Sequence, residues 1–381
     1  MEFGWDDEQE ALRVAAASFA RHELNLDVLG RDHRAEFSRE AWRKCADFGV
    51  LGLPFPRAHG GAEADMLTTI LTMEGLGYGC RDNGLLFALN AQMWSVQHPI
   101  AEFGSDRQRE RYLPGLIAGN LIGAHGMSEP GSGSDAHSLA TRAVHVDGGY
   151  VLNGTKTFVT SAPHCDLALV FATLDPQLGQ WGLTAFIVET GTPGFSVGRD
   201  IDKMGLRTAP MGELVLSDCF VSEESRLGPE GAGAAIFGSS MEWERGSILA
   251  THVGAMQRQL ETCVEYARER RQFGKPIGQF QSVSNRIADM AVRLETSRLI
   301  LYKVAWLKAK GEPAAFEAAV AKLHLSECFV RSSEDAIRIH GGYGYATESQ
   351  IERDLRDAIG STIVSGTSDI QRSIIANWLE G

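Results

Sequence analysis

The sequence predicts a mainly helical chain with one β-rich insert, in the order helical, β, helical. Two changes in the spacing of apolar residues support this fold class. Apolar residues recur every three or four positions from residue 6 to about 120, at every second position from about 121 to 228, and at helical spacing again from 231 onward. The chain has 381 residues, 44% of them hydrophobic, and can therefore bury the cores of two or three structural units.

The first region begins with a helix that has a capping residue. Asp6 or Asp7 can accept hydrogen bonds from the first free N–H groups of the helix that follows, in which apolar residues recur at steps of three and four. Glycine and proline gather at 49–52 and 54–61, and these clusters predict joins between successive helices.

The middle region contains short runs that are typical of strands. Segments 168–173, 184–189 and 213–218 combine apolar residues with the alternation expected of a sheet. Segments 147–149 and 153–154 contain Asp-Gly-Gly and Asn-Gly, and these residues predict tight turns between strands.

The last region returns to helical periodicity. A long apolar-periodic stretch runs from Ala234 to about Arg271, and further helices are expected near 280–310 and 313–340. The chain contains no internal repeat and no low-complexity segment.

Composition excludes several classes of function. The net charge of −13 is spread along the chain, whereas a protein that binds nucleic acid presents a basic surface. The six cysteines stand apart and the histidines form no ligand motif, so no metal site is expected. The amino terminus is acidic, and no apolar run approaches the roughly 18 residues that span a membrane. We therefore expect a cytoplasmic protein with no nucleic-acid or membrane partner.

Three segments rich in small residues are candidates for ligand binding. The first, 127–135, combines serines and glycines, so that backbone N–H groups and hydroxyls can approach a polar ligand closely. An ordinary Gly-Ser turn is the alternative. The others, 339–345 and 365–372, lie beside helical stretches, and a helix start suits phosphate or a carbonyl oxygen. None of them matches a dinucleotide or P-loop fingerprint.

Five segments resemble the signature blocks of the acyl-CoA dehydrogenase family in order and spacing: 128–135, 270–275, 341–344, 356–357 and 366–372. The resemblance covers essentially the whole chain. It implies an N-terminal helical domain, a middle β-barrel and a C-terminal four-helix bundle, with FAD bound between barrel and bundle in a homotetramer. The domains are expected at 1–120, 121–230 and 231–381.

The resemblance also implies which residues bind FAD, some of them in a neighbouring subunit. On the barrel side these are Met127, Ser128, Gly133, Ser134, Phe158 and Thr160. The other expected contacts, to the pyrophosphate and adenosine among other parts, come from Arg270, Gln272, Phe273, Ile277, Phe280, Arg338, Gly342, Thr367 and Asp369. Arg270 suits a phosphate best because its planar guanidinium offers paired donors.

The family chemistry requires a carboxylate. Oxidation of an acyl thioester between Cα and Cβ needs a base for the α proton, donors to the carbonyl oxygen and a flavin that accepts the β hydride. Many family members carry the base immediately before the Gly-Thr of the last block, where this chain has Ser365. A serine cannot serve as a base at neutral pH.

A second family position for the base is a glutamate immediately before an arginine on the first long bundle helix. Glu244-Arg245 matches it, so the resemblance implies Glu244 as the base and the backbone N–H of Ser365 as a donor to the thioester carbonyl. The alternative for Glu244 is a solvated helix carboxylate paired with an arginine. Glu242 should point elsewhere, because residues two apart do not share a helix face.

Four segments look more like a carrier-protein-specific branch of the family, such as the prolyl-carrier-protein dehydrogenases of antibiotic biosynthesis: 202–207, 240–245, 338–342 and 362–367. The acyl group is then expected on a phosphopantetheine arm. Phe158 replaces a tryptophan that is common in relatives, which leaves an electron-transferring flavoprotein and oxygen both open as electron acceptors. Arg338 replaces a common glutamine at a cofactor contact.

Three alternatives stay open. A dehydrogenase of short or branched acyl-CoA catabolism would use the same chemistry on coenzyme A. A flavin oxidase or monooxygenase on the same scaffold would consume oxygen in step with its substrate. A catalytically silent flavin scaffold would bind FAD without reacting with any thioester, and Glu244 argues against it.

Overall fold

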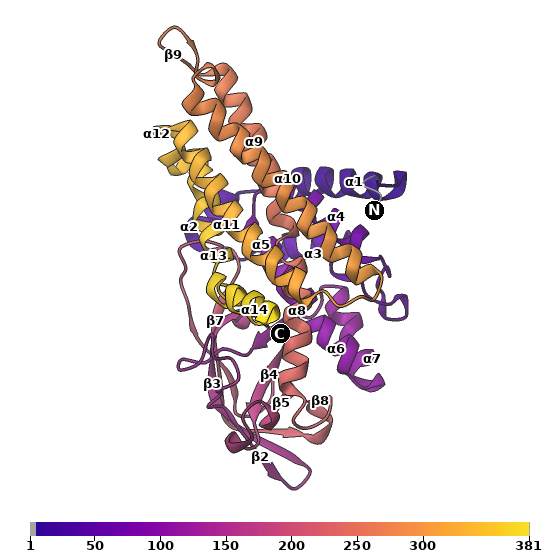
Figure 1. Ribbon diagram of the computed structural model, residues 1–381. Helices are drawn as coiled ribbons and strands as arrows, with labels where there is room; N and C mark the ends of the chain where they lie inside the picture. Colours follow the sequence, from indigo (N-terminus) through magenta and orange to yellow (C-terminus); the bar gives the residue numbers. More distant parts are fainter. Residues whose placement is uncertain (1–4, 381) are drawn as a thin grey trace.

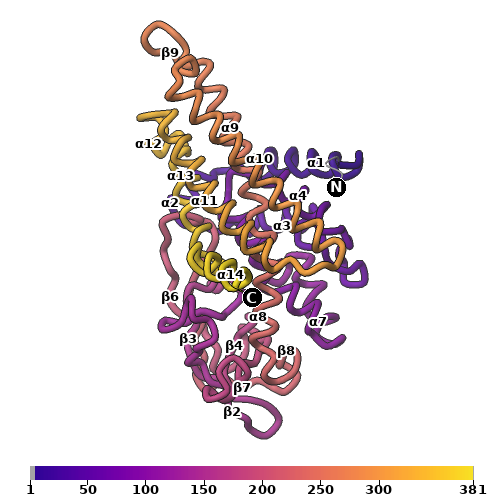
Figure 2. The backbone as a smooth tube through the Cα atoms, in the orientation of Figure 1, coloured from indigo at the N-terminus to yellow at the C-terminus, as the bar shows by residue number. Residues whose placement is uncertain are grey.

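The structure, a computed structural model, describes residues 5–380. It consists of an N-terminal helical region, a middle region built on one β-sheet and a C-terminal helical region, in the predicted order (Figure 1, Figure 2). The sheet lies at one end of the molecule and the long C-terminal helices extend toward the other. The predicted fold class is confirmed.

The helices and strands have the following bounds. The N-terminal region contains α1 (Asp7–Glu23), α2 (Val28–Arg34), α3 (Arg39–Asp47), α4 (Met66–Gly79), α5 (Asn83–Gln92), the π-helical turn η3 (Met93–Gln97), α6 (His98–Phe103) and α7 (Asp106–Ile117). The middle region contains β1 (Gly123–Gly126), β2 (Arg142–Val146), β3 (Gly149–Thr160), β4 (Leu167–Thr173), β5 (Leu183–Glu189), β6 (Phe195–Asp200), β7 (Met211–Ser222) and β8 (Arg226–Leu227). The C-terminal region contains α8 (Gly233–Ser247), α9 (Ala250–Glu269), β9 (Arg271–Gln272), β10 (Lys275–Pro276), α10 (Gln281–Ala309), α11 (Ala315–His340), α12 (Gly342–Tyr345), α13 (Ile351–Ser361) and α14 (Ser368–Glu380).

Asp6 caps α1, as its position predicts. The Asp6 carboxylate accepts a hydrogen bond from the backbone N–H of Gln9 at 2.7 Å, and Gln9 Oε1 accepts one from the backbone N–H of Asp6 at 3.3 Å. This reciprocal pair is a capping box, which satisfies two donors that the helix leaves free.

Strand β4 joins the sheet to the helices because both of its faces are buried. Leu169 and Phe171 point into the core that the sheet shares with the helices, whereas Ala168 and Val170 point into a second core inside the middle region. The strand order is β6-β7-β3-β2-β4-β5-β8, with β1 paired to β4 in parallel. Among the described residues the edge strands β6 and β8 are not paired with each other, so the sheet is open where the resemblance implies a closed barrel.

Two local predictions are wrong. Asn153 and Gly154 lie inside β3 rather than in a turn, at an irregularity in the pairing of β3 with β7. Gly154 has a φ of 156°, and a Cβ there would lie 2.3 Å from Thr141 Oγ1, so the glycine allows a bulge and a close backbone approach. The helix expected over 234–271 is divided into α8 and α9.

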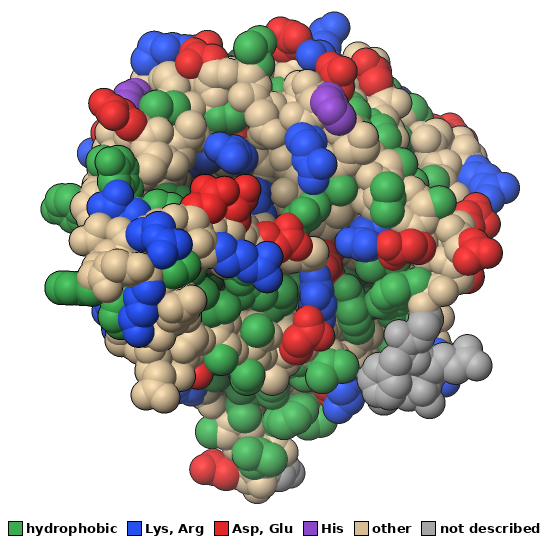
Figure 3. Space-filling model, turned by 90° about the horizontal axis from the view of Figure 1, so that it is seen from above, with side chains coloured by type: hydrophobic (Ala, Val, Ile, Leu, Met, Phe, Trp, Pro, Cys, Tyr) green, Lys and Arg blue, Asp and Glu red, His purple; other side chains and the backbone are tan. Residues whose placement is uncertain are grey.

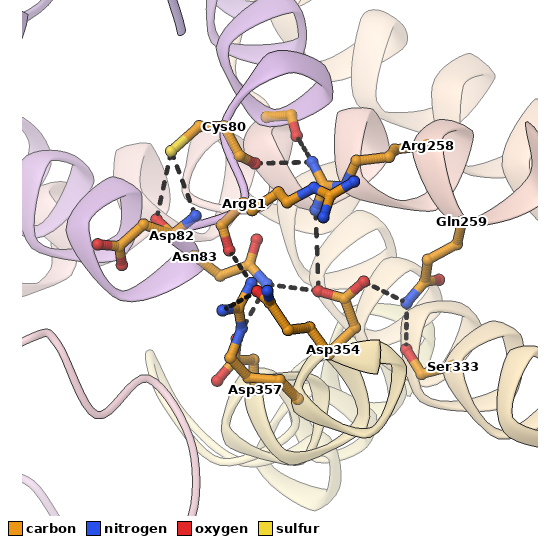
Figure 4. A network of polar contacts seen from close by, with 12 residues as sticks. Cys80, Arg81, Asp82, Asn83, Arg258, Gln259, Ser333, Asp354 and Asp357 are labelled. Carbon is orange, nitrogen blue, oxygen red and sulfur yellow. Dashed lines mark hydrogen bonds and ion pairs between the residues drawn. The ribbon is translucent and has the colours of Figure 1, made fainter. Parts of the chain in front are cut away.

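A buried polar network ties the N-terminal helices to the C-terminal region (Figure 4). Asn83 Nδ2 donates hydrogen bonds to Asp354 and Asp357 of α13, both at 2.9 Å. Arg258 of α9 donates to the carbonyl oxygen of Cys80 at 2.7 Å. Burial raises the pKa of Asp357 to about 6. The network fixes α13, and with it the turn that follows, against the N-terminal region.

Four features concern membrane-spanning helices, metal ligands, cysteines and surface charge. Within residues 5–380, no helix is long and apolar enough to cross a membrane, and no cluster of three or more His, Cys, Asp or Glu side chains could hold a metal ion. The six cysteines are free and buried. On the face drawn in Figure 3, positive and negative side chains lie beside one another with hydrophobic side chains between them. That face therefore carries no surface of a single sign for a polyanion.

Helices α4 and α9 cross with their backbones in contact. A Cβ at Gly77 of α4 would lie 1.9 Å from the carbonyl oxygen of Thr251, and a Cβ at Gly254 of α9 would lie 2.1 Å from the carbonyl oxygen of Glu74. Only glycine permits this approach on each side.

We predict that Gly77→Ala destabilises the protein by about 3 kcal/mol, because the added methyl group forces the two helices apart. Gly238→Ala is the matched control: Gly238 lies on the exposed side of α8, and a Cβ there meets no atom within 4 Å. This control should raise stability by about 0.5 kcal/mol through helix propensity. Urea unfolding monitored by circular dichroism measures both, and equal midpoints for the two variants would contradict the crossing geometry.

Candidate active site

Glu244 lies near the C-terminal end of α8 and points into the protein. The residue is only 7% exposed. Its carboxylate accepts hydrogen bonds from the hydroxyls of Ser95 in η3 and Ser365 before α14. Three parts of the chain that are distant in sequence therefore meet at this carboxylate, and its burial excludes the alternative of a solvated helix residue.

Glu242 points in another direction, as expected for a residue two positions earlier on a helix. Its carboxylate forms an ion pair with Lys308 of α10 and accepts a hydrogen bond from the backbone N–H of Ala314 at 3.4 Å. The chain thus contains a second glutamate on α8 that does not take part in the contacts of Glu244.

The turn before α14 contains two consecutive residues with left-handed backbone. The φ angles are 57° at Ser365 and 88° at Gly366. Arg245, the neighbour of Glu244, donates a hydrogen bond from Nε to the carbonyl oxygen of Ser365 at 3.0 Å. The backbone N–H groups of Ser365, Gly366 and Thr367 donate to no acceptor within residues 5–380. Free backbone donors of this turn therefore lie next to the buried carboxylate.

Burial and nearby charges act on Glu244 in opposite directions. Burial raises its pKa above the ordinary value, whereas the hydrogen bonds from Ser365 and Ser95 and the positive charges of Arg245 and Lys322 lower it. Lys322 of α11 is fully buried, and its Nζ has no hydrogen-bond partner among the described residues. Burial lowers the pKa of this amine to about 8. Such a carboxylate can accept a proton from a carbon acid whose carbonyl oxygen is bound by the neighbouring N–H groups.

The residues expected on the barrel side lie on two adjoining segments. Met127 and Ser128 follow β1, and the carbonyl oxygen of Ser128 accepts a hydrogen bond from the backbone N–H of Thr157 in β3 at 2.9 Å. Phe158, the next residue, is 64% exposed and has a φ of 55°. At Gly133 a Cβ would meet no atom within 4 Å, so the loop leaves open space beside the strand. Of the remaining members, Ser134 in the loop is exposed, and Thr160 at the end of β3 is half-buried.

A buried ion pair holds this loop against β3. Lys156 Nζ lies 2.7 Å from Glu129 Oε1, and the two side chains are 0% and 4% exposed. Lys156 also donates to the carbonyl oxygen of Met127 at 3.3 Å. The Glu129 carboxylate accepts further hydrogen bonds from the backbone N–H groups of Ala140 at 2.6 Å and Thr141 at 3.0 Å. Both charges are thus compensated in the interior.

A second group of expected cofactor contacts lies at the far end of the C-terminal helices, where the β9–β10 hairpin projects from the molecule (Figure 1). Phe273 near the hairpin tip is 93% exposed. The guanidinium of Arg270 lies 5.9 Å from the ring centre of Tyr343, which places the hairpin beside α12. Ile277 is buried in a small local core, so its side chain faces the protein. The remaining members of this group are Gln272, Phe280, Arg338 and Gly342.

The last two expected contacts lie elsewhere, at the start of α14. Thr367 Oγ1 accepts a hydrogen bond from the backbone N–H of Ile370 at 3.2 Å, and Asp369 is exposed and pairs with Arg372 at 3.0 Å. Within one chain, the expected cofactor residues are therefore divided between the middle region, the start of α14 and the distant hairpin.

Sequence reasoning missed three residues around Glu244. Ser95 lies in an apolar stretch, and its direction depends on a π-helical turn that leaves no sequence signal. Arg245 was noted only as part of a motif, yet it binds the carbonyl oxygen of Ser365. Lys322 could have been found, because it occupies a position on the apolar face of α11 between Ala318 and Leu325.

Comparison with known proteins covers nearly the whole chain. Family models match at residues 6–120 for "Acyl-CoA dehydrogenase, N-terminal domain", at 124–219 for the middle domain and at 231–380 for the C-terminal domain. An L-prolyl-[peptidyl-carrier protein] dehydrogenase of Pseudomonas fluorescens is 42% identical over 381 residues, which span 100% of each chain.

Two solved structures are similar throughout. A crystal structure described as that of the prolyl acyl carrier protein oxidase AnaB has a TM-score of 0.98 and 49% identity, and the match covers 99% of this chain and 100% of the other. A structure described as PigA with FAD and proline has a TM-score of 0.97 and 43% identity, with coverage of 100% and 99%.

We predict that Glu129→Ala lowers stability by about 3–5 kcal/mol, because it leaves the Lys156 ammonium buried without a counter-charge. Glu36→Ala is the matched control, since Glu36 forms an ion pair with Arg34 at 2.8 Å in which the side chains are 52% and 56% exposed. That change should cost less than about 1 kcal/mol. Urea unfolding compares the two variants, and a small effect at Glu129 would show that the interior tolerates the free charge.

Proposed function

The chain belongs to the acyl-CoA dehydrogenase family, and on that premise we propose that it is an FAD-dependent enzyme that oxidises a prolyl thioester on a peptidyl carrier protein between Cα and Cβ. The observation that carries the proposal is the buried carboxylate of Glu244 beside the free N–H groups of the Ser365 turn. A base and an oxyanion donor are the two protein groups that α-proton removal from a thioester needs.

The residues present fit FAD. The exposed ring of Phe158 and the open backbone at Gly133 leave a surface for a flat aromatic group on the middle region. At the start of α14, Ser368 Oγ and Gln371 Oε1 are buried without a hydrogen-bond partner in the described residues, next to the free N–H groups. Polar atoms of this kind suit a ligand that carries many hydrogen-bonding groups.

The chain's own residues perform the acid–base part of the proposed reaction. Glu244 accepts the Cα hydrogen as a proton, while the backbone N–H of Ser365 donates to the thioester carbonyl oxygen as negative charge develops on it. The C–H bonds at Cα and Cβ break and a double bond forms between the two carbons. Bound FAD supplies the acceptor for the hydride that leaves Cβ. Met127, Ser128, Ser134, Phe158 and Thr160 would hold the cofactor from the middle region.

We propose a homo-oligomer, a tetramer as in the family, in which one FAD contacts two chains. The division of the expected cofactor residues between the middle region and the distant hairpin supports this arrangement (Figure 1). Arg270 and the 93% exposed Phe273 would then reach a cofactor held by a second copy. Tyr343 and Tyr345 of the adjacent α12 are exposed as well, and a group of exposed aromatic rings is typical of an interface.

The similarity to carrier-protein enzymes favours a carrier-bound substrate over free acyl-CoA. Both kinds of substrate present the same thioester on a phosphopantetheine arm, so the proposed chemistry of Glu244 is the same for each. The electron acceptor remains either a flavoprotein or oxygen. The similarity to AnaB, which is described as an oxidase, favours oxygen. An oxygen electrode would then record consumption in step with product formation.

We predict that Glu244→Gln slows the reduction of FAD by the loaded carrier protein by a factor of about 10³, because an amide cannot accept the α proton. FAD binding should persist. Glu242→Gln is the matched control on the same helix, and its rate should stay close to that of the parent. Stopped-flow absorbance of the flavin measures the rates. Reduction of the Glu244→Gln enzyme at the parental rate would rule out Glu244 as the base.

We predict that prolyl carrier protein loses one or two pairs of hydrogen atoms on incubation with the enzyme, whereas butyryl-CoA and isovaleryl-CoA do not react at a comparable rate. Mass spectrometry of the loaded carrier protein and of the CoA esters measures both. Equal turnover of an acyl-CoA would instead support the alternative of acyl-CoA catabolism.

A further inference from the structure

The turn that carries Ser95 has an unusual backbone. Residues Met93–Gln97 form the π-helical turn η3 between α5 and α6, and all five residues are buried. Such a turn inserts an extra residue into the helical repeat and changes the direction in which its side chains point. Short π-helical turns are frequent at functional sites, which makes the direction of each side chain in η3 informative.

The side chains next to Ser95 prevent this turn from rotating. Trp94 Nε1 donates a hydrogen bond to Asn90 Oδ1 at 3.0 Å, and Gln97 Nε2 donates to the carbonyl oxygen of Leu51 at 2.8 Å. The direction of the Ser95 hydroxyl is therefore determined by contacts within the N-terminal region.

Among residues 5–380, the hydroxyl of Ser95 has one hydrogen-bond partner, the carboxylate of Glu244. Ser95 is 3% exposed, and its neighbours Trp94 and Val96 are each 1% exposed and apolar. A buried hydroxyl in such surroundings costs free energy unless it is hydrogen-bonded. The hydrogen bond to Glu244 therefore offsets the cost of burying the Ser95 hydroxyl.

We propose that Ser95 is a positioning residue for Glu244: its hydroxyl holds the carboxylate in the direction needed for proton abstraction, and η3 makes the N-terminal region part of the active site. This inference rests on the proposed function, because it assigns to Ser95 a role that acts through the base.

Four groups act on the Glu244 carboxylate from the elements packed around it. They are Ser95 of η3, Ser365 of the turn before α14, Arg245 of α8 and Lys322 of α11. All four favour the charged form, since two donate hydrogen bonds to it and two are cations. Loss of the Ser95 hydroxyl therefore raises the pKa of Glu244, so that ionisation of the base is delayed to higher pH.

The test compares Ser95→Ala with Ser240→Ala in the FAD-loaded enzyme. Ser240 is a matched control because it is also fully buried, lies on α8 and donates its hydroxyl to the carbonyl oxygen of Phe237 rather than to Glu244. For Ser95→Ala, the acid limb of kcat/KM should move to higher pH, and kcat/KM below that limb should fall about tenfold. The Ser240→Ala profile should match that of the parent.

A second readout does not depend on catalysis. Infrared difference spectra of the protein without substrate can follow the C=O stretch of the protonated Glu244 carboxyl group, which is assigned by its absence in Glu244→Gln. Its titration midpoint should be higher in Ser95→Ala than in the parent, and Ser95→Thr, which keeps the hydroxyl, should restore the parental midpoint. If Ser95→Ala does not fold, Ser95→Cys provides the comparison, because a thiol is a weaker donor and should give a smaller shift in the same direction.

The two hypotheses fail in different ways. A parental midpoint and a parental pH profile in Ser95→Ala would overturn the role of Ser95 and leave the function of Glu244 intact. A Glu244→Gln enzyme that reduces FAD normally would overturn the proposed function itself, whatever the effect of Ser95.

Discussion

The double contact between α8 and Ser365 is the interaction on which the site depends. The Glu244 carboxylate accepts a hydrogen bond from the hydroxyl of Ser365, and Arg245 Nε donates one to the carbonyl oxygen of Ser365 at 3.0 Å. Two successive residues of one helix therefore hold a single residue by its side chain and its backbone. This contact supports the left-handed φ of 57° at Ser365, which would be unfavourable without it, and leaves the N–H groups of the turn free. The serine at residue 365, where many family members have a carboxylate, and the carboxylate at residue 244 are thus in direct contact.

Opposing effects act on the pKa of the buried Glu244 carboxylate. Burial raises the pKa of Glu244 and so favours the protonated form, which cannot act as a base. The cations of Arg245 and Lys322 and the hydroxyls of Ser95 and Ser365 counter that effect. Lys322 has no hydrogen-bond partner of its own among the described residues, so it acts on Glu244 through its charge. The same logic holds at Glu129 and Lys156, where an ion pair positions the loop beside β3.

Local sequence signals predicted much of the fold and part of the site. Asp6 caps α1 because an N-cap depends only on neighbouring residues. The apolar run of segment 168–173 predicted β4, and the run is continuous because both faces of that strand are buried. The turn predicted at Asn153-Gly154 is wrong because a glycine that favours a turn also permits a bulge inside β3. The resemblance pointed to Glu244, but no local pattern could reveal Ser95, since its direction depends on a π-helical turn and its partner lies 149 residues away.

In the proposed reaction, one carboxylate oxygen of Glu244 lies at the α carbon of a carrier-bound thioester. A crystal structure of the FAD-loaded enzyme with an unreactive thioether analogue of prolyl-phosphopantetheine tests this most directly. We expect a Glu244 oxygen within about 3.5 Å of Cα, with the Ser365 N–H directed at the carbonyl oxygen. A complex in which Cα faces another carboxylate, or in which Glu244 has turned away from the bound group, would contradict it.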